Sequence, residues 1–536
     1  MTHARAGRTP IRFGTDGWRA RIADEFTFEN VERVAQAYAD FLNQQQTDLL
    51  KQQRAAEDSG RRGGKTAARR GGKDSLSGGK DALGGGDSPS GGRDSLIGGR
   101  DSFKKASARH PHVVVGYDRR FLSERFAERA AEVLSGNQIA VSLFGSDVPT
   151  PLVSWAVRER GAAGGVVITA SHNPPDFNGF KIKAPWGGSA TAETTVAVES
   201  LLDAQTPQLA SIPEGARGGL GREVESYREK VSEYVDLARI RSARARVVVD
   251  PMHGTGGRWV ESFLRGGRLA SETIRAERDP LFGGVNPEPI DRNLAPLKEG
   301  VLNRRALVGL ATDGDADRVG AVNERGETMT MHEVVPVVLL HLARRRLLSG
   351  GVVRTFSQSV LLKRIAAALG LTLHETPIGF KYIADLMLRE DILIGAEESG
   401  GIGVRGHIPE RDGILNSLLL LEAVVAACKT PTELVAEMHR EFGEFYFGRR
   451  DLQMEVARGL ALVGSLATRP PAAVEGFDVQ SVETLDGTKL VFGDESWLLF
   501  RQSGTEPVLR VYAEATSVPK RETLLDEGCR LAHEFH

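Results

Sequence analysis

The sequence has only two cysteines, Cys428 and Cys529, among its 536 residues. So few thiols exclude a framework of disulfide bonds. Long hydrophobic runs are lacking too, because the most apolar stretch, residues 414–427, contains Asn416 and Glu422 and is shorter than a membrane-spanning helix. That stretch predicts a helix buried in a protein core.

No charge of one sign dominates either. The 69 lysines and arginines nearly balance 71 aspartates and glutamates, and the formal net charge is −2. Without a basic excess there is no electrostatic reason to expect nucleic-acid binding. The first residues are charged and contain no apolar segment, which argues against a signal peptide. We therefore expect a cytoplasmic protein that binds neither nucleic acid nor membrane, and composition leaves its oligomeric state open.

Length and pattern indicate several α/β domains. A chain of 536 residues is long enough for about three or four domains of ordinary size. Apolar strand patterns at residues 112–117 and 246–252 alternate with helical patterns such as those at residues 124–134 and 360–369. This alternation is typical of layered α/β folds.

Residues 51–105 differ from the rest of the chain. A short unit that begins Gly-Gly-Lys-Asp or Gly-Gly-Arg-Asp recurs at positions 71, 78, 91 and 98. One apolar residue per unit cannot offset the conformational entropy lost on ordering. We therefore predict a disordered low-complexity insertion at 51–105.

The segment Thr-Ala-Ser-His-Asn-Pro at residues 169–174, here called the serine turn, places Ser171 at a sharp bend. The apolar stretch 164–170 predicts a buried strand, and Asn-Pro then ends it. A hydroxyl held at the end of a rigid strand can serve as a nucleophile or a phosphate carrier.

Aspartates occupy every second position in Asp-Gly-Asp-Ala-Asp-Arg, residues 313–318. In an extended chain this spacing places Asp313, Asp315 and Asp317, here called the aspartate cluster, on one side. Three hard oxygen ligands suit Mg²⁺, which binds few carboxylates together with phosphate oxygens. A calcium loop is the alternative, since the twelfth position is a glutamate, but Arg318 stands at the sixth position, where that loop needs glycine. We therefore predict a magnesium site.

Two further segments carry groups that bind sugars and phosphates. Glu397 and Ser399 lie in the sugar loop, residues 397–401, where two glycines follow them. In the phosphate loop, residues 501–507, Arg501 and two hydroxyl side chains surround a glycine, and Arg510 follows. An arginine, hydroxyls and a flexible backbone suit a phosphate group.

In this order the four segments resemble the α-D-phosphohexomutase family, enzymes that move phosphate between C1 and C6 of a hexose. The opening Phe-Gly-Thr-Asp-Gly-Trp-Arg at residues 13–19 is similar to that family's first motif. The resemblance implies three mixed α/β domains and a smaller C-terminal α+β domain around a central cleft. Motif spacing places these domains at residues 1–217, 218–327, 328–441 and 442–536, and they carry in turn the serine turn, the aspartate cluster, the sugar loop and the phosphate loop.

The resemblance also implies a mechanism. Ser171 would carry a phosphate in the resting enzyme, and it would share Mg²⁺ with Asp313, Asp315 and Asp317. Hexose 1-phosphate would accept that phosphate at O6, the bisphosphate would turn end for end, and its C1 phosphate would return to the serine. Glucose 1,6-bisphosphate would be the intermediate and the activator.

The remaining site residues follow from the same resemblance. Arg19 and Arg318 would neutralise the moving phosphate, and His172 would shape the surroundings of the phosphoserine. Lys181 would either transfer a proton or bind phosphate. The substrate would be bound by Lys381, Glu397, Ser399, Arg411, Arg501, Ser503, Gly504, Thr505 and Arg510.

The run Gly379-Phe380-Lys381 resembles glucose-directed members, so glucose 1-phosphate is the first expectation and phosphoglucomutase the expected activity. Phosphomannomutase and phosphoglucosamine mutase are the alternatives. Gly401 stands where members that accept both glucose and mannose carry histidine, and Glu398 where glucosamine-directed members carry glutamine. Two other classes stay open, a Mg²⁺-dependent sugar phosphatase and a sugar-phosphate sensor without catalysis.

Overall fold

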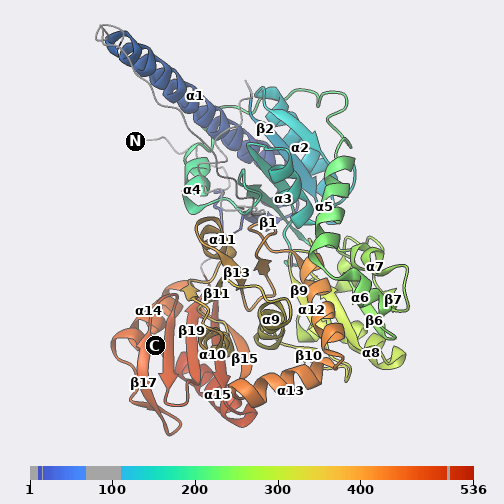
Figure 1. The fold of residues 1–536 in the computed structure, drawn as a ribbon. Helices are drawn as coiled ribbons and strands as arrows, with labels where there is room; N and C mark the ends of the chain where they lie inside the picture. The colour runs from blue at the N-terminus through green and yellow to red at the C-terminus, as the bar shows by residue number, and fades with distance from the viewer. Residues whose placement is uncertain (1–9, 15, 68–109, 504–506, 536) are drawn as a thin grey trace, which may run out of the picture.

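The computed structural model describes residues 10–14, 16–67, 110–503 and 507–535. Its strands form four sheets that follow one another along the chain, each with its own helices (Figure 1). The parts built on these sheets are called domains I to IV. The predicted α/β class, with four domains, is confirmed.

Domain I has a five-stranded sheet in the order β1-β5-β4-β2-β3. Strand β4 is buried along its whole length, because α1 and α2 pack on one face of the sheet and α3 packs on the other. The elements are β1 (Trp18–Arg21), α1 (Phe28–Ala67), β2 (His112–Tyr117), α2 (Ser123–Gly136), β3 (Ala140–Leu143), α3 (Thr150–Glu159), β4 (Gly164–Ile168), β5 (Phe177–Lys183) and α4 (Ala192–Ser200).

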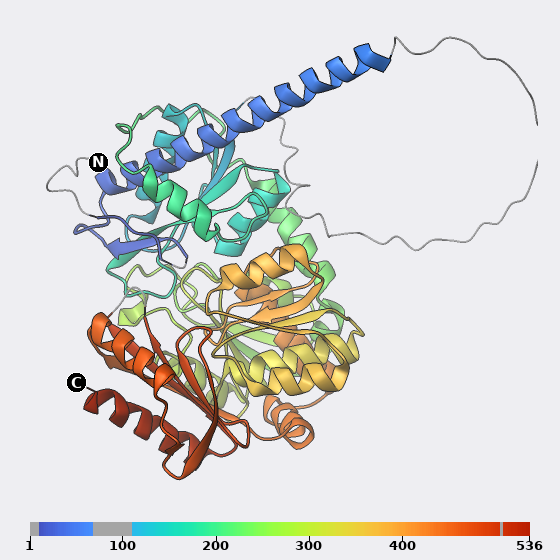
Figure 2. The same cartoon turned by 90° about the vertical axis from the view of Figure 1, so that its left-hand side faces the viewer.

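Helix α1 corrects one expectation from the sequence. Residues 51–67, predicted to belong to a disordered insertion, continue this helix, which projects well beyond the sheet that it packs on (Figure 2). Lysine, glutamine, arginine, alanine and glutamate fill positions 51–57, and all of them favour helix. The rest of the predicted insertion, residues 68–105, lies outside the described residues.

Domain II follows two connecting helices, α5 (Gly221–Tyr234) and α6 (Leu237–Ser242). Its sheet has the order β10-β9-β8-β6-β7, with β8 parallel to β6 and antiparallel to β9. The turn between β8 and β9 carries the aspartate cluster. The elements are β6 (Arg246–Asp250), α7 (Trp259–Leu264), β7 (Ala270–Thr273), the 3₁₀ turns η2 (Phe282–Gly284) and η3 (Asp291–Asn293), α8 (Ala295–Arg304), β8 (Val308–Thr312), β9 (Val319–Val322) and β10 (Thr328–Met329).

Domain III has a four-stranded sheet in the order β12-β11-β13-β14. The buried helix predicted at residues 414–427 is α12, which begins where the Asp412 side chain accepts a hydrogen bond from the backbone N–H of Leu415. The elements are α9 (Met331–Leu340), the π-helical turn η4 (His341–Arg345), β11 (Gly351–Thr355), α10 (Val360–Leu369), β12 (Leu373–Thr376), α11 (Phe380–Arg389), β13 (Ile392–Ala396), β14 (Ile402–Val404), α12 (Gly413–Ala427) and α13 (Pro431–Phe442).

Domain IV is an antiparallel sheet in the order β15-β20-β19-β18-β17-β16. One face packs against α14 and α15. The other face contributes Trp497, Leu499 and Tyr512 to an apolar core shared with domain III. The elements are β15 (Tyr446–Gln453), α14 (Val456–Thr468), β16 (Ala473–Val474), β17 (Phe477–Glu483), β18 (Thr488–Phe492), β19 (Trp497–Gln502), β20 (Val508–Ala515) and α15 (Val518–Glu534).

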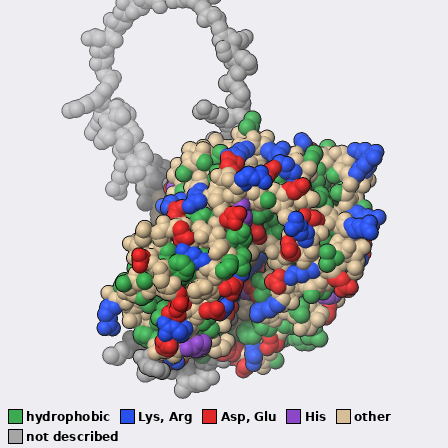
Figure 3. All heavy atoms as spheres, turned by 90° about the horizontal axis from the view of Figure 1, so that it is seen from below, with side chains coloured by type: hydrophobic (Ala, Val, Ile, Leu, Met, Phe, Trp, Pro, Cys, Tyr) green, Lys and Arg blue, Asp and Glu red, His purple; other side chains and the backbone are tan. Residues whose placement is uncertain are grey.

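The surface reflects the balanced composition. On the face in Figure 3, basic and acidic side chains are interspersed, and neither sign dominates. Within the described ranges no single helix is long and apolar enough to cross a membrane, although the pair α12 and α13, bent by 79°, passes by length and composition alone.

Candidate active site

Ser171 lies at the turn that follows β4, in the left-handed backbone conformation with φ 52°. Its backbone N–H donates to Thr169 Oγ1 at 2.8 Å, and its hydroxyl donates to Asp313 Oδ2 at 2.7 Å. Only 1% of the residue is exposed. The structure therefore has the strand and turn that the sequence predicts, and the serine hydroxyl faces the aspartate cluster.

A buried arginine that sequence analysis missed holds the serine turn in place. Arg120 is completely buried, pairs with the buried Asp118 at 3.2 Å, and donates to four backbone carbonyls at 2.6–3.0 Å. These carbonyls belong to Ser171, Asn173, Pro174 and Phe177. The only sequence signal is a pair of arginines shortly after β2, and nothing in it indicates a partner more than 50 residues away.

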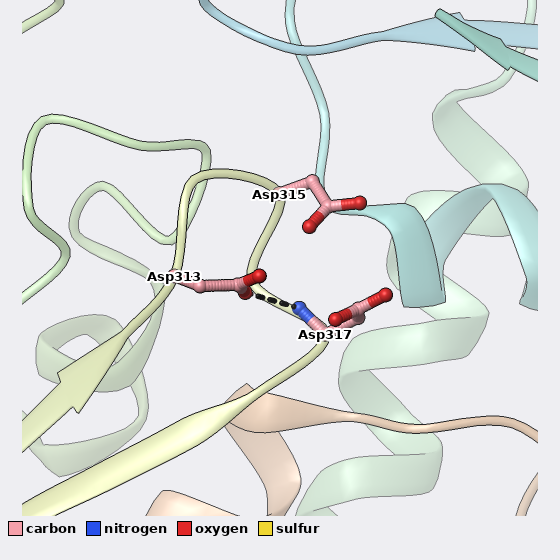
Figure 4. A group of neighbouring side chains, drawn as sticks. All are labelled: Asp313, Asp315 and Asp317. Atoms are coloured by element: carbon pink, nitrogen blue, oxygen red, sulfur yellow. Dashed lines mark hydrogen bonds between the residues drawn. The ribbon is translucent and has the colours of Figure 1, made fainter. Parts of the chain in front are cut away.

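The aspartate cluster forms in the turn between β8 and β9 (Figure 4). All three side chains are buried, and one oxygen of each lies within 4.8 Å of the others. The alternating spacing of the aspartates suggests an extended chain, but the structure has a turn here, with Ala316 at φ 59°. Asp313 Oδ1 stabilises this turn by accepting the backbone N–H groups of Asp317 and Arg318 at 3.0 and 3.1 Å.

The cluster fits a divalent cation. Asp315 Oδ1 and Asp317 Oδ1 are buried and accept no hydrogen bond from the described residues. Burial, together with repulsion from Asp315 and Asp317, raises the pKa of Asp313 well above its usual value. A hard cation would bind these oxygens and reduce the repulsion among the three carboxylates. The donor set of three carboxylates beside a hydroxyl therefore suits the predicted magnesium.

Two buried cations lie against the aspartate cluster. Lys181 Nζ, on β5, is 2.8 Å from Asp315 and 3.2 Å from Asp317, and Arg411 Nη2 is 2.8 Å from Asp317. Both also contact Asp16, at 2.9 and 2.5 Å, a residue of the opening motif to which sequence analysis assigned no role. Burial by itself lowers the pKa of Lys181, but the three carboxylates outweigh it and raise the pKa above its usual value.

Two more predicted residues border the serine. Arg19, on β1, donates to Asn173 Oδ1 in the serine turn at 2.7 Å. His172 Nδ1 lies 3.4 Å from the Ser171 hydroxyl. Burial, with Arg318 and other nearby cations, holds the pKa of His172 well below its usual value, so that its imidazole is neutral.

The sugar loop lies next to the aspartate cluster and contacts neighbouring residues through a backbone hydrogen bond and through the Glu397 side chain. Val319 N–H donates to the Gly400 carbonyl at 3.0 Å, and Glu397 Oε2 lies 3.7 Å from Arg411 Nη1. Glu397 is 5% exposed. Its burial raises the pKa of Glu397 to about 7, although Arg411 and Arg318 oppose this rise.

Ser399 and Lys381 are less closely tied to the site. Ser399 is half-buried in the sugar loop. Lys381 lies in the first turn of α11, with Nζ 5.2 Å from the centre of the Tyr382 ring. Within the described part of the chain neither side chain has a polar contact with the aspartate cluster.

The phosphate loop begins at the end of β19. Arg501 and Arg510 lie directly opposite each other on β19 and β20, so their side chains share one face of the sheet. Ser503 is buried just beyond β19. Two neighbouring guanidinium groups place two positive charges on this face of the sheet, which suits a phosphate. The other two predicted residues of this loop, Gly504 and Thr505, lie outside the described residues.

A cavity on the molecule lies away from these residues. A cavity of about 600 Å³ lies between the loop after β3 and helices α5 and α7, where Arg228 and Trp259 are among its lining residues. None of the predicted site residues lines it. The site is defined instead by the serine, carboxylates and cations that converge where domains I, II and III meet.

Comparison with family models gives matches over most of the chain. The phosphoglucomutase/phosphomannomutase α/β/α domains I, II and III match residues 100–208, 225–326 and 331–442, and the C-terminal domain of the same family matches residues 461–530.

Individual relatives agree with these matches. The chain is 32% identical to a phosphoglucomutase/phosphomannomutase of Thermococcus kodakarensis, over 80% of this chain and 92% of that protein. It is 30% identical to a phosphoglucosamine mutase of Halorhodospira halophila, over 77% and 86% of the two chains. The crystal structure of a candidate phosphomannomutase from Thermus thermophilus superposes with a TM-score of 0.78 at 33% identity, covering 98% of this chain and all of that one.

Proposed function

The chain belongs to the phosphoglucomutase/phosphomannomutase family of intramolecular phosphotransferases, and on that premise we propose that it interconverts the 1-phosphate and 6-phosphate of a hexose through a phosphoserine at Ser171. The observation that carries this proposal is the 2.7 Å contact between the Ser171 hydroxyl and Asp313, inside a buried group of carboxylates and cations. A phosphate on this serine would be surrounded by the groups that phosphoryl transfer needs.

The proposed reaction has two halves. O6 of the hexose 1-phosphate attacks the phosphorus of phosphoserine, the bond to the serine oxygen breaks, and the O6 proton ends on the serine hydroxyl. The hexose 1,6-bisphosphate then turns end for end. In the second half the serine hydroxyl attacks the phosphorus on O1, and the bond between that phosphorus and O1 breaks. The serine proton ends on O1, and hexose 6-phosphate leaves.

The buried side chains around Ser171 support this chemistry mainly through charge. Phosphoryl transfer depends on positioning and on neutralising the phosphoryl oxygens. A divalent cation held by the aspartate cluster would contribute part of that neutralisation. Arg19, in contact with the serine turn, and Arg318 would contribute more. Lys181 is in contact with three carboxylates, which favours the alternative in which it binds phosphate as a cation over one in which it accepts a proton.

The other loops would hold the end of the substrate that does not react. Arg501 and Arg510 would bind its phosphate, and the buried Glu397 would accept hydrogen bonds from ring hydroxyls. Both interactions are available in either orientation of the bisphosphate. This explains why four separate segments of the chain each look like part of a site.

For the sugar, we propose mannose 1-phosphate as the preferred substrate, with glucosamine 1-phosphate second. This revises the first expectation of glucose, which depended on the Gly379-Phe380-Lys381 run. The 33% identical structure is described as a candidate phosphomannomutase, and several relatives near 30% identity are phosphoglucosamine mutases, which supports the revision. Because mannose and glucose differ at C2 alone, we expect a preference of about one hydrogen bond, ~0.5–1.5 kcal/mol.

The test is ³¹P NMR of mannose 1-phosphate mixed with enzyme, Mg²⁺ and a catalytic amount of mannose 1,6-bisphosphate. We expect the 1-phosphate signal to be replaced by that of the 6-phosphate. Release of inorganic phosphate would indicate a phosphatase, and an unchanged spectrum would contradict the proposal for this sugar. Repeating the run with glucose and glucosamine 1-phosphates ranks the three substrates.

A further inference from the structure

Asp486 lies where domain III meets domain IV beside the phosphate loop, and the reaction proposed above assigns it no role. Its Oδ2 accepts the backbone N–H of Ile378 at 2.8 Å. Its Oδ1 forms an ion pair with Arg501, 3.1 Å from Nε. One carboxylate therefore touches both the start of the Gly379-Phe380-Lys381 run and an arginine of the phosphate loop.

The hairpin that carries Asp486 is built for this close approach. Gly487 has φ 101°, and a Cβ at this position would lie 2.4 Å from the Phe500 carbonyl oxygen and 3.2 Å from Arg501 Cβ. Only glycine lets the turn between β17 and β18 lie so near the end of β19. The backbone therefore determines where Asp486 stands, next to Arg501.

The Asp486 carboxylate also compensates the positive charge of Arg501. Arg501 and Arg510 are directly opposite on neighbouring strands, and like charges in that position repel each other. Asp451, opposite Arg510 on β15, accepts hydrogen bonds from Nε and Nη2 of Arg449 at 2.8 and 2.7 Å, so it serves the Arg510 and Arg449 side of this group. Asp486 is thus the carboxylate placed to hold Arg501 while the phosphate is absent.

Docking of domain IV on domain III does not depend on this contact. The buried carboxylate of Glu514 on β20 pairs with His332 Nδ1 at 2.9 Å and accepts from Ser359 Oγ at 2.6 Å, Val360 N–H at 2.9 Å and Trp497 Nε1 at 3.0 Å. His332, Ser359 and Val360 belong to domain III, so the Glu514 carboxylate connects the two domains. Because the Glu514 contacts hold the two domains together, a substitution at Asp486 is expected to change substrate binding rather than domain packing.

We propose that Asp486 is a positioning residue that orients Arg501 for the substrate phosphate and ties it to the loop at residues 377–381. The inference rests on the proposed function, because it assigns Arg501 to phosphate binding. Its consequence is that phosphate binding and the position of the 377–381 loop are coupled, so that loss of Asp486 weakens substrate binding more than it slows the chemical step.

Three variants test this role. D486A removes both contacts, and D486N keeps an oxygen for Ile378 N–H but removes the charge beside Arg501. The matched control is D494N, which removes another aspartate charge of domain IV, paired with Lys520 at 2.8 Å in a different turn. Each is purified as the full chain and assayed with mannose 1-phosphate.

We expect D486A to raise KM about 10-fold with a much smaller change in kcat, and D486N to raise KM by about 3-fold. D494N should lower the melting temperature and leave KM unchanged. The proposal is overturned if KM of D486A stays within about twofold of the wild type, or if D494N raises KM equally. If the wild type converts no hexose phosphate, the proposed function fails by itself. In that case calorimetric titration with inorganic phosphate tests the role of Asp486. The proposal requires D486A to bind phosphate more weakly than the wild type does.

Discussion

The burial of Glu397, which we propose to bind the sugar, has a cost in stability that can be measured. Its carboxyl is buried beside Arg411 and Arg318, and burial still raises the pKa of Glu397 to about 7, from 4.5 for an ordinary glutamate. The folded protein therefore holds this proton more tightly than the unfolded chain. Stability is lost as pH rises from about 4.5 through about 7, and the full cost is present above that range. At about 1.4 kcal/mol per pKa unit, the ionised Glu397 lowers the free energy of unfolding at pH ~8 by an amount on the order of 3 kcal/mol.

Glutamine has the shape of protonated glutamate without its titration, so Glu397→Gln should stabilise the substrate-free protein at pH ~8 by about 1–3 kcal/mol, and by less at pH ~5. At pH ~8, where the wild-type carboxylate is ionised, activity of the variant should fall about 10- to 100-fold in kcat/KM, because the variant loses charge-assisted hydrogen bonds to the sugar.

The assay is thermal unfolding of wild type and variant at both pH values, without metal or substrate. Glu398→Gln is the control, since this neighbouring carboxylate is half-buried and accepts a hydrogen bond from Ser357 at 2.8 Å. The control should gain no stability at high pH. A Glu397→Gln variant that melts below the wild type at pH ~8 would refute the reasoning.

Three further predictions concern the metal, the serine turn and the sugar. Mg²⁺ at about 100 times its dissociation constant should raise the stability of the wild type by about 2.7 kcal/mol, seen as a higher melting temperature; Asp315→Asn should lose most of this rise, and an equal rise in that variant would count against the site. Arg120→Met should destabilise the protein by about 3–5 kcal/mol, because it leaves Asp118 and four carbonyls buried without their donor. Arg119→Met breaks a partly exposed pair with Asp147 and one hydrogen bond to the Ala276 carbonyl, so it should cost less, and an equal loss of stability in the two variants would contradict this reasoning. Mannose 1-phosphate should exceed glucose 1-phosphate in kcat/KM by about 2- to 10-fold in steady-state assays, and a reversed ratio would restore the glucose assignment.

Local chemistry made much of the site predictable. Ser171, the aspartate cluster and Glu397 each follow a buried strand, where an apolar run ends at a polar turn. Such a pattern is visible in sequence because both the strand and the turn depend on neighbouring residues. The conformation was less predictable, since alternate aspartates suggested an extended chain and the structure has a turn.

Partners distant in sequence could not be predicted in this way. Asp16 meets Lys181 and Arg411, and Asp486 meets Ile378 and Arg501, only because the four sheets bring their turns together. A lone aspartate in a turn carries no signal of the cation that it will face. The length of α1 was missed for a different reason, because the glycine-rich composition of residues 51–105 concealed the helix-forming residues at its start.

The central claim is that phosphate passes through Ser171, and a labelling experiment tests it most directly. Wild-type enzyme is incubated with ³²P-labelled mannose 1,6-bisphosphate, freed of sugar, mapped by peptide mass spectrometry, and then mixed with unlabelled mannose 1-phosphate. We predict label on the peptide that contains Ser171, its transfer to the sugar on mixing, and no label on Ser171→Ala. Label on another residue, label that leaves only as inorganic phosphate, or near-normal turnover by Ser171→Ala would contradict the account.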